Sequence, residues 1–232
     1  MYRVNTPAII TVATFLLTAL WFFFPIGKED LDSLLFDMRL ALPAAILAAG
    51  CFASSSKLAM CAFLFCALGD AMGVLNSFEG QMGGFAIAHI CFILLLAKDI
   101  RIAALSPVTF VGTALLCSLP LIPATLKVLP AVHDLSLRIG CIVYALLLTT
   151  TMLTGILRYL CTRAGGNPLT LAAALGGVSF LASDFILAWN KFTAHIPNAS
   201  LLIMTTYYAA LLLLFTGTLR NNKTKGETLN TK

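Results

Sequence analysis

Eight apolar stretches follow one another along the chain, separated by short segments that hold most of its charged residues. Most are long enough to cross a bilayer as a helix, and none alternates like a barrel strand. Inside lipid, only helices and closed barrels satisfy the backbone. We therefore expect an all-α, polytopic membrane helix bundle in a single domain over residues 1–220. Its eight transmembrane helices are expected at residues 6–25, 38–53, 58–75, 81–97, 102–119, 136–160, 168–189 and 199–219.

The fifth stretch is the least regular. Ser106-Pro107 has the pattern of a helix cap followed by a first-turn proline, and Pro120 and Pro123 then interrupt the apolar run. We expect residues 121–135 to form an interfacial or re-entrant segment rather than a plain loop.

The distribution of Lys and Arg predicts the orientation of the bundle, because cytoplasmic loops carry the excess. Eight spans place ten of the fifteen on the N-terminal side: Arg3, Lys57, Lys98, Arg101, Arg158, Arg163, Arg220, Lys223, Lys225 and Lys232. The opposite side carries Lys28, Arg39, Lys127, Arg138 and Lys191. Both termini are therefore expected in the cytoplasm, with residues 221–232 as a polar, basic cytoplasmic tail.

Composition narrows the class further. The chain is 59% hydrophobic and 11% charged, which excludes an ordinary soluble domain. Its net charge of +5 is explained by membrane topology, so no nucleic-acid partner is expected. The seven cysteines form no CxxC pair and are expected to be packing residues.

Residues 7–26 are expected to be a retained helix and not a signal peptide. Short loops without sorting extensions favour a bacterial inner membrane.

Two carboxyl groups, Asp70 and Asp184, lie in the middle of apolar runs. An unpaired ionised carboxylate in hydrocarbon is costly, so intramembrane acids are a functional-site hypothesis by default. In the predicted topology each lies about five residues before the outer end of its span, about 8 Å inside the non-cytoplasmic boundary. A shared site is therefore plausible, although a buried Asp can also simply hydrogen-bond a neighbouring helix.

Other polar residues are predicted near that layer. His89 lies midway along the fourth span, and Tyr207 and Tyr208 lie on the eighth. His89 is more typical of a hydrogen-bonded structural or substrate-positioning residue than of a metal ligand, and the tyrosine pair is equally typical of core or interfacial aromatics. Residues predicted to rim the outer mouth are Asn76, Ser77, Ser183, Asn190 and Lys191. Gly83-Gly84 and Gly176-Gly177 are expected to be packing glycines.

Three blocks of residues carry a family resemblance. They are Leu68-Gly69-Asp70, then Gly83-Gly84-Phe85-Ala86-Ile87-Ala88-His89, then Gly176-Gly177 with Phe180, Ser183-Asp184, Leu187-Ala188 and Asn190-Lys191-Phe192, followed by Tyr207-Tyr208-Ala209. In these blocks the chain resembles the lysoplasmalogenase family of integral membrane hydrolases, also called the YhhN-like family. It departs from the family pattern at Leu42-Pro43, where Lys-Pro is common, at Phe92, where Tyr is usual, and at Ala210, where Gln is frequent.

The resemblance implies a substrate and a reaction. The substrate is a lysoplasmalogen, a 1-alkenyl lysophospholipid, whose vinyl ether bond is cleaved by water to a fatty aldehyde and a glycerophospho-headgroup. Such a reaction suits two buried carboxyl groups, one protonated to supply an acid and one ionised to activate water. Asp70 and Asp184 are the expected catalytic pair, without an assignment of acid and base. His89, Tyr207, Tyr208, Asn190 and Lys191 are expected to bind or orient the substrate. No metal or organic cofactor is needed.

Two other classes remain as alternatives. A small proton- or cation-coupled transporter would use the same two aspartates as ion sites, but the internal repeats and broken helices typical of transporters are absent from the sequence. A metal-dependent hydrolase would need His89, His133 and His195, and the last two lie in or beside predicted loops without a paired ligand motif.

Overall fold

The computed structural model describes residues 6–24, 33–53, 56–162 and 167–219, and every regular element among them is helical. Eight helical stretches are long and apolar enough to cross a membrane, as predicted. The helices are α1 (Thr6–Phe23), α2 (Ser33–Asp37), α3 (Leu42–Ala53), α4 (Lys57–Val74), α5 (Phe78–Ala97), α6 (Pro107–Ser118), α7 (Leu121–Pro123), α8 (Leu129–Ala131), α9 (Leu135–Thr162), α10 (Pro168–Phe192) and α11 (Ala199–Thr218). Short 3₁₀ segments, η1 (Met38–Ala41) and η2 (Ile102–Ala104), and a π segment, η3 (Ala124–Val128), complete the set.

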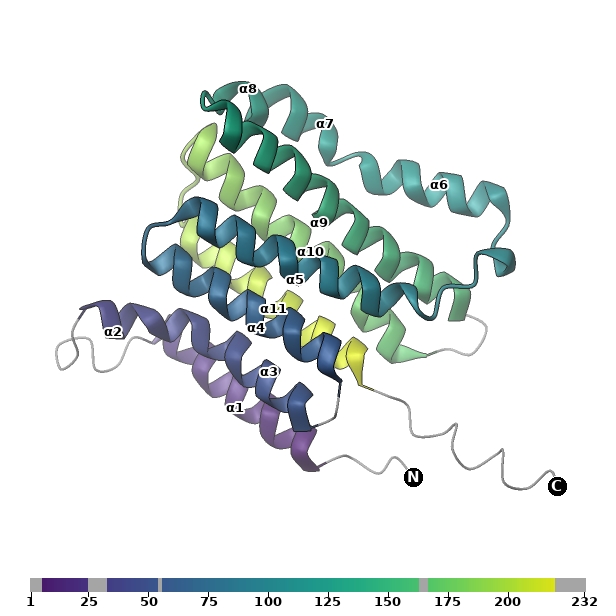
Figure 1. Cartoon of the computed structure of the whole chain (residues 1–232), viewed down its shortest axis with the longest axis horizontal. Helices are drawn as coiled ribbons and strands as arrows, with labels where there is room; N and C mark the ends of the chain where they lie inside the picture. The colour runs from purple at the N-terminus through teal and green to yellow at the C-terminus, as the bar shows by residue number, and fades with distance from the viewer. Residues whose placement is uncertain (1–5, 25–32, 54–55, 163–166, 220–232) are drawn as a thin grey trace.

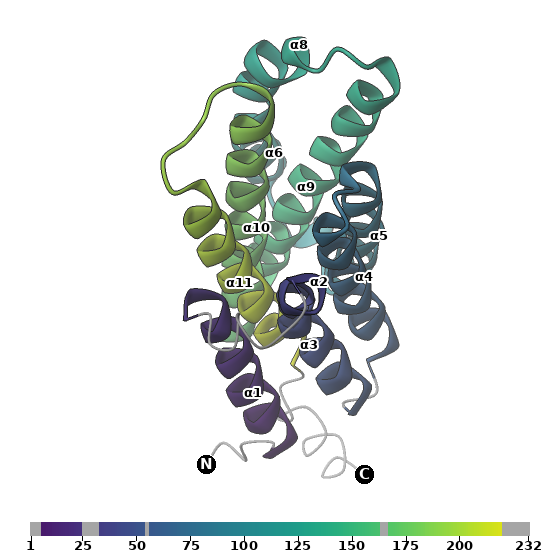
Figure 2. The ribbon, with the colours of Figure 1, turned by 90° about the vertical axis from the view of Figure 1, so that its left-hand side faces the viewer.

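The helices form one bundle with α10 in a central position. Helix α10 packs against both α9 and α11, α5 packs against α4 and α9, and α3 packs against α1 and α4 (Figure 1). Helix α6 lies on the outside, against α9. Seen from the side, α1 starts and α11 ends at the same end of the bundle (Figure 2). This arrangement agrees with an even number of spans, whereas the predicted tail at residues 221–232 lies outside the described residues.

The second and fifth spans differ from their predicted bounds. The second begins at Ser33, because α2, η1 and α3 continue one another over Ser33–Phe52. The fifth candidate span covers Pro107–Ala131, but α6 ends at Ser118, close to the predicted bound, and α7, η3 and α8 follow after a turn at residues 119–120. Each proline removes a backbone donor from the helix, so α6 stops before Pro120, and the π turn of η3 follows Pro123. An interfacial or re-entrant position for residues 121–135 stays a prediction.

Glycines bring the helices close together. Of the four glycines predicted to pack, in Gly83-Gly84 and Gly176-Gly177, three do so. A Cβ on Gly84 would lie 2.8 Å from the backbone nitrogen of Gly69, so α4 and α5 are in backbone contact there. Gly177 approaches α9 in the same way, 2.9 Å from the Cα of Met152, and Gly176 approaches α11 at Leu214. Gly83 was predicted to pack but faces open space. Small residues thus set the spacing of the helices that carry the two aspartates.

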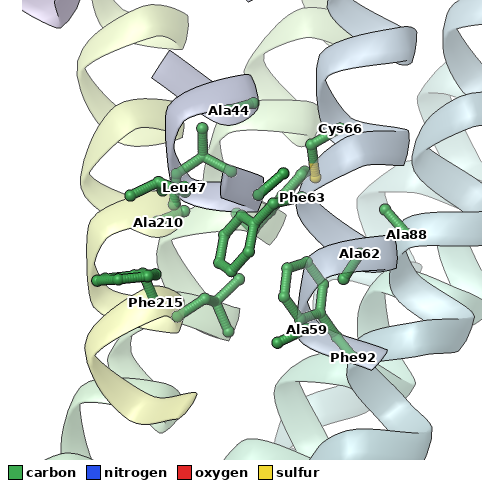
Figure 3. Packing of buried hydrophobic residues seen from close by; sticks show 14 of the residues in the cluster. Ala44, Leu47, Ala59, Ala62, Phe63, Cys66, Ala88, Phe92, Ala210 and Phe215 are labelled. Carbon is green, nitrogen blue, oxygen red and sulfur yellow. The ribbon is translucent and has the colours of Figure 1, made fainter. Parts of the chain in front are cut away.

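The apolar core lies between α3, α4, α5 and α11 (Figure 3). The ring of Phe63 meets Phe92 at 5.3 Å and Phe215 at 6.0 Å between centroids. Four of the seven cysteines are buried in the bundle, which confirms their predicted role in packing: Cys51, Cys66, Cys91 and Cys117. This core packs α4 and α5, the helices that carry Asp70 and His89, against their neighbours.

Candidate functional site

Asp70 is buried on α4 and accepts a hydrogen bond from α11. The hydroxyl of Tyr207 donates to Asp70 Oδ2 at 2.8 Å. Only 8% of Asp70 is exposed, and Tyr207 is buried as well. Helix α4 brings the carboxyl group to this point because Gly69, the residue before it, packs directly against α5. The bond therefore ties the third span to the eighth.

Asp184 has an equivalent environment on α10. The hydroxyl of Tyr144, on α9, donates to Asp184 Oδ2 in a short hydrogen bond. Asp184 is 7% exposed. Tyr144 could not be recognised from the sequence, because a lone Tyr in an apolar helix is indistinguishable from an ordinary core or interfacial aromatic. Each aspartate thus has its own tyrosine donor.

The two carboxyl groups and their tyrosine partners belong to one cluster of side chains. Aromatic rings join the two halves of this cluster. Phe180, one turn before Asp184, contacts the rings of Phe85 at 5.9 Å and of Tyr207 at 5.4 Å. Phe85 in turn lies 5.7 Å from Tyr207. These ring contacts link the surroundings of the two aspartates, whose common depth stays a prediction, and α10 continues for eight residues beyond Asp184 rather than about five.

His89 lies beside this cluster and is fully buried. Its ring centroid is 4.5 Å from that of Phe180 and 5.7 Å from that of Tyr144. His89 Nδ1 is 3.0 Å from Thr151 Oγ1, and the same hydroxyl donates to the carbonyl of Leu147. With the Thr151 proton on Leu147, Nδ1–H donates to Thr151, and Nε2 is a buried acceptor without a partner among the described residues.

Among the described residues, none of the other predicted site residues hydrogen-bonds to either carboxyl group, although the Tyr208 ring lies 5.7 Å from that of Tyr207. The ring of Tyr208 packs against Phe15, Phe22 and Phe23 of α1, and its hydroxyl is buried without a partner. Asn190 accepts a hydrogen bond from the backbone of Ile196 in the α10–α11 connection. Lys191 is exposed, with Nζ 4.6 Å from the centroid of Phe78.

Ser183 was predicted to rim the outer mouth of the site, but it is buried. Its hydroxyl donates to the carbonyl of Ile203 at 3.1 Å and so joins α10 to α11. The prediction required Ser183 to face the outer opening of the site. Here the close approach of α10 and α11 turns it into a contact between helices.

No cation balances the two carboxyl groups among the described residues. The ion pairs found there join Arg39 to Asp37 at 3.2 Å and Arg158 to Asp99 at 2.8 Å, and both include an exposed acid. Asp70 and Asp184 are instead stabilised by tyrosine hydroxyls. Two buried carboxylates without a cation are energetically unfavourable, so the arrangement favours protonation of at least one of them.

Each carboxyl group lines a different cavity. Asp184 and Tyr144 lie on the wall of a cavity of about 180 Å³ between α5, α9, α10 and the α7–α8 region, most of whose other lining residues are apolar. Asp70 lies on the wall of a second cavity of about 360 Å³, which is lined by Asp37, Leu40, Asp70, Gly73, Val74, Gln81 and Met204. Gln81 lines both. The site can therefore be reached from an apolar and from a polar side.

Comparison with known proteins places this site in a family context. The chain is similar to human lysoplasmalogenase TMEM86B, with 48% identity over 50 residues, 22% of each chain. It is 32% identical to the pig lysoplasmalogenase TMEM86B over 154 residues, 66% of this chain and 59% of the pig protein. Bovine lysoplasmalogenase TMEM86A is 46% identical over 44 residues, 19% of this chain and 18% of that protein.

These matches cover less than two thirds of the length of the relatives. No solved structure matches the chain. Residues 34–218 match the YhhN family. This range contains every residue of the cluster around Asp70 and Asp184. Because the match covers most of the sequence, the chain belongs to the YhhN family.

Proposed function

We propose that this protein is an ether hydrolase of the lysoplasmalogenase type, acting on 1-alkenyl lysophospholipids such as the ethanolamine and choline forms. The observation that carries the proposal is the pair of buried aspartates, each held by a tyrosine hydroxyl and neither paired with a cation among the described residues. The similarity to proteins named lysoplasmalogenase supports the choice of substrate class.

The first step is protonation of a carbon atom. A vinyl ether is hydrolysed by adding a proton to its β-carbon, which creates an oxocarbenium ion at the carbon bound to oxygen. One aspartic acid supplies this proton, and the resulting carboxylate faces the cation that it has just formed. The second aspartate takes a proton from water, whose oxygen bonds to the cationic carbon and gives a hemiacetal.

The second step releases the products and restores both groups. The first carboxylate removes the hemiacetal hydroxyl proton, while the second, now protonated, gives its proton to the departing glycerol oxygen. The carbon–oxygen bond breaks, giving a fatty aldehyde and the glycerophospho-headgroup. Two carboxyl groups in opposite protonation states thus complete the cycle, as in two-carboxylate glycosidases, and the scheme needs no metal or organic cofactor.

The remaining residues have supporting roles in this proposal. Tyr207 and Tyr144 hold the carboxyl groups in position through the hydrogen bonds that they donate. His89 presents its unpartnered Nε2 beside the cluster as an acceptor for water or for a substrate hydroxyl. Lys191, exposed near the end of α10, is placed to meet a phosphate headgroup at the surface. We propose no chemical role for Asn190, which accepts from the backbone of Ile196, or for Tyr208, whose ring packs against Tyr207.

The protein is an integral, multi-pass membrane protein. We propose a bacterial inner membrane with both termini in the cytoplasm, on the basis of the Lys and Arg asymmetry. A lysophospholipid substrate would then keep its headgroup at the interface while its hydrocarbon chain stays between helices.

The test is aldehyde release by the purified protein in detergent. We expect aldehyde from an alkenyl lysophospholipid and none from the saturated alkyl ether of the same headgroup. Asp70→Asn and Asp184→Asn should each lower kcat by about 10²- to 10⁴-fold, the usual contribution of a general acid or base. Asp99→Asn, which removes an exposed acid paired with Arg158, is the matched control and should keep full activity.

Either aspartate variant with wild-type turnover would overturn the scheme. A folded preparation that releases no aldehyde from any headgroup form would overturn the proposed function. Cation-dependent uptake into vesicles, lost in the same two variants, would then point to a transporter.

A further inference from the structure

The cavity beside Asp184 has the character of a hydrocarbon site. Phe85, Leu148, Leu181 and Phe185 are among the residues that line it, and Asp184 is the one acidic residue on its wall. Its volume, about 180 Å³, exceeds the roughly 150 Å³ of a dry cavity that holds one benzene ring. It can therefore hold the part of an alkyl chain nearest the reacting bond, but not a whole fatty chain.

The fifth span separates this cavity from the outside of the bundle. The π segment Ala124–Val128 forms part of the cavity wall. The span that contains it, Pro107–Ala131, is the least enclosed of the eight, with 6% of its apolar window buried. Helix α6 lies on the outside of the bundle against α9 (Figure 1). A chain leaving the cavity past this wall enters lipid directly.

The cavity beside Asp70 has the opposite character. Three of its seven lining residues are polar: Asp37, Asp70 and Gln81. The side chain of Asp37 is 57% exposed, so this cavity extends towards the surface of the protein. Water and a glycerol group are suited to such a wall, and a hydrocarbon chain is not.

Gln81 is the partition between the two cavities, because it lines both. Its side chain lies against α4, where a Cβ on Gly73 would come within 2.9 Å of Gln81 Nε2. The amide group thus has a fixed place at the boundary. It offers both a donor and an acceptor to a ligand that crosses there.

We propose that the substrate lies across this boundary, with the start of its alkenyl chain beside Asp184 and its glycerol ether end beside Asp70. This inference rests on the proposed hydrolase function and goes on to assign the two catalytic roles. The β-carbon that receives a proton belongs to the chain, so Asp184 is the proton donor. The attacking water comes from the polar cavity, so Asp70 is the base, and Gln81 positions the ether between them.

Isotope exchange tests the assignment of roles. In Asp70→Asn the water-activating base is absent, so the oxocarbenium ion returns to alkene by giving a proton back to Asp184. Substrate recovered from this variant in D₂O should therefore carry deuterium on the β-carbon. In Asp184→Asn no proton reaches that carbon, and the recovered substrate should carry none. The reverse pattern, exchange in both variants or exchange in neither would overturn the assignment.

A second experiment tests the placement without any turnover. A saturated alkyl lysophospholipid that carries a diazirine on its chain close to the ether is photolysed with the intact protein, and the adducts are mapped by mass spectrometry. We expect adducts on cavity residues of α9 and α10, such as Ala145 and Phe185, that excess unlabelled alkyl lipid abolishes. Adducts confined to the lipid-facing surface and insensitive to competitor would overturn the placement.

Matched variants sharpen this result. Ala145→Leu fills the apolar cavity and should abolish those adducts while raising KM roughly tenfold or more. Gly112→Leu adds the same side chain on α6, where a Cβ would meet nothing within 4 Å, and should behave as the wild type. Competed adducts in a protein that releases no aldehyde would support the chain site and refute the hydrolase, so the two failures are distinguishable.

Discussion

At the scale of single residues, the two aspartates are held in apolar surroundings by hydroxyl groups instead of cations. A tyrosine donor satisfies a carboxylate oxygen without neutralising its charge permanently, so the group can gain and lose a proton during a reaction. A lysine or arginine in the same place would keep the carboxylate ionised. The two tyrosines are therefore expected to affect turnover more than stability.

The tyrosine hydroxyls can be removed one at a time. Tyr144→Phe and Tyr207→Phe each lose a hydrogen bond to a carboxyl group, worth about 1.5–3 kcal/mol, so kcat should fall about 10- to 100-fold. Tyr208→Phe is the matched control, because its hydroxyl is buried without a partner. That variant should keep its activity and melt at the same or a higher temperature in detergent. Wild-type kcat in both test variants would contradict the role given to the hydroxyls.

His89 depends on one neighbour for its orientation, and the dependence can be measured as stability. Thr151→Val leaves Nδ1–H buried without an acceptor and should lower the free energy of unfolding by about 1–3 kcal/mol. Thr149→Val, the same change on the same helix, removes a hydroxyl that has no partner and should be neutral or stabilising. Equal melting temperatures for the two variants would show that the His89–Thr151 bond contributes nothing.

The sequence predicted part of this cluster. Asp70, Asp184 and His89 stand out because polar groups are rare in apolar runs. Tyr207 was found because it lies in one of the sequence blocks that resemble the YhhN family. Tyr144 and Gln81 could not be found in the same way. Tyr144 is forty residues from Asp184, and only the packing of α9 on α10 makes them partners. Gln81 lies at the predicted start of its span, where a polar residue is ordinary.

At the scale of secondary structure elements, the contact between α4 and α5 determines where Asp70 points. The two helices meet at Gly69 and Gly84, and neither position has room for a side chain. Asp70 follows Gly69 directly, so any separation of the helices moves its carboxyl group away from Tyr207. Apolar helices attract one another only weakly in lipid, and such close packing is what holds them in register.

Two adjacent glycines on α5 allow this contact to be tested. Gly84→Ala places a methyl group 2.8 Å from the backbone of Gly69 and should destabilise the protein by about 1–3 kcal/mol, with loss of most activity. Gly83→Ala meets nothing within 4 Å and should be neutral or stabilising by up to about 1 kcal/mol. Thermal melting and aldehyde release measure both. Equal effects of the two substitutions would argue against the backbone contact.

The elements were predictable except where prolines lie. Length and hydropathy locate all eight spans, because the requirement to cross a bilayer is strong. The fifth span was predicted to stop at residue 119, since prolines usually end helices. Helix α6 does end there, at Ser118. Local sequence does not encode the short helical segments α7, η3 and α8 that follow the turn, because they depend on contacts with α9 and α10.

At the scale of the whole molecule, charge asymmetry and an even number of spans predict a single orientation. The starts of α1 and α4 and the end of α11 lie at one end of the bundle (Figure 2). The exposed acid Asp37 is placed by the predicted topology at the other end, beside the cavity of Asp70. The proposed catalytic pair would then lie nearer the non-cytoplasmic side.

Reporter fusions test this orientation. A green fluorescent protein fused after residue 232 should fluoresce in bacterial cells, and alkaline phosphatase at the same place should be inactive, because both termini are expected in the cytoplasm. Alkaline phosphatase inserted after Asn76, between α4 and α5, should be active. The opposite set of signals would invert the predicted topology and place the site near the cytoplasmic face.

The Asp70–Tyr207 hydrogen bond joins residues 137 positions apart, and this separation has a consequence for biogenesis. At about 5–20 residues per second, the ribosome takes roughly 7 to 27 seconds to make Tyr207 after Asp70. During that interval α4 has to enter the bilayer without the Tyr207 partner of its acid. The cost is below the about 2.5–3.5 kcal/mol of a helix centre, because Asp70 lies near the end of α4. The leucines and phenylalanines of α4 have to outweigh that cost alone. The same side chains therefore drive membrane insertion first and pack in the folded bundle later.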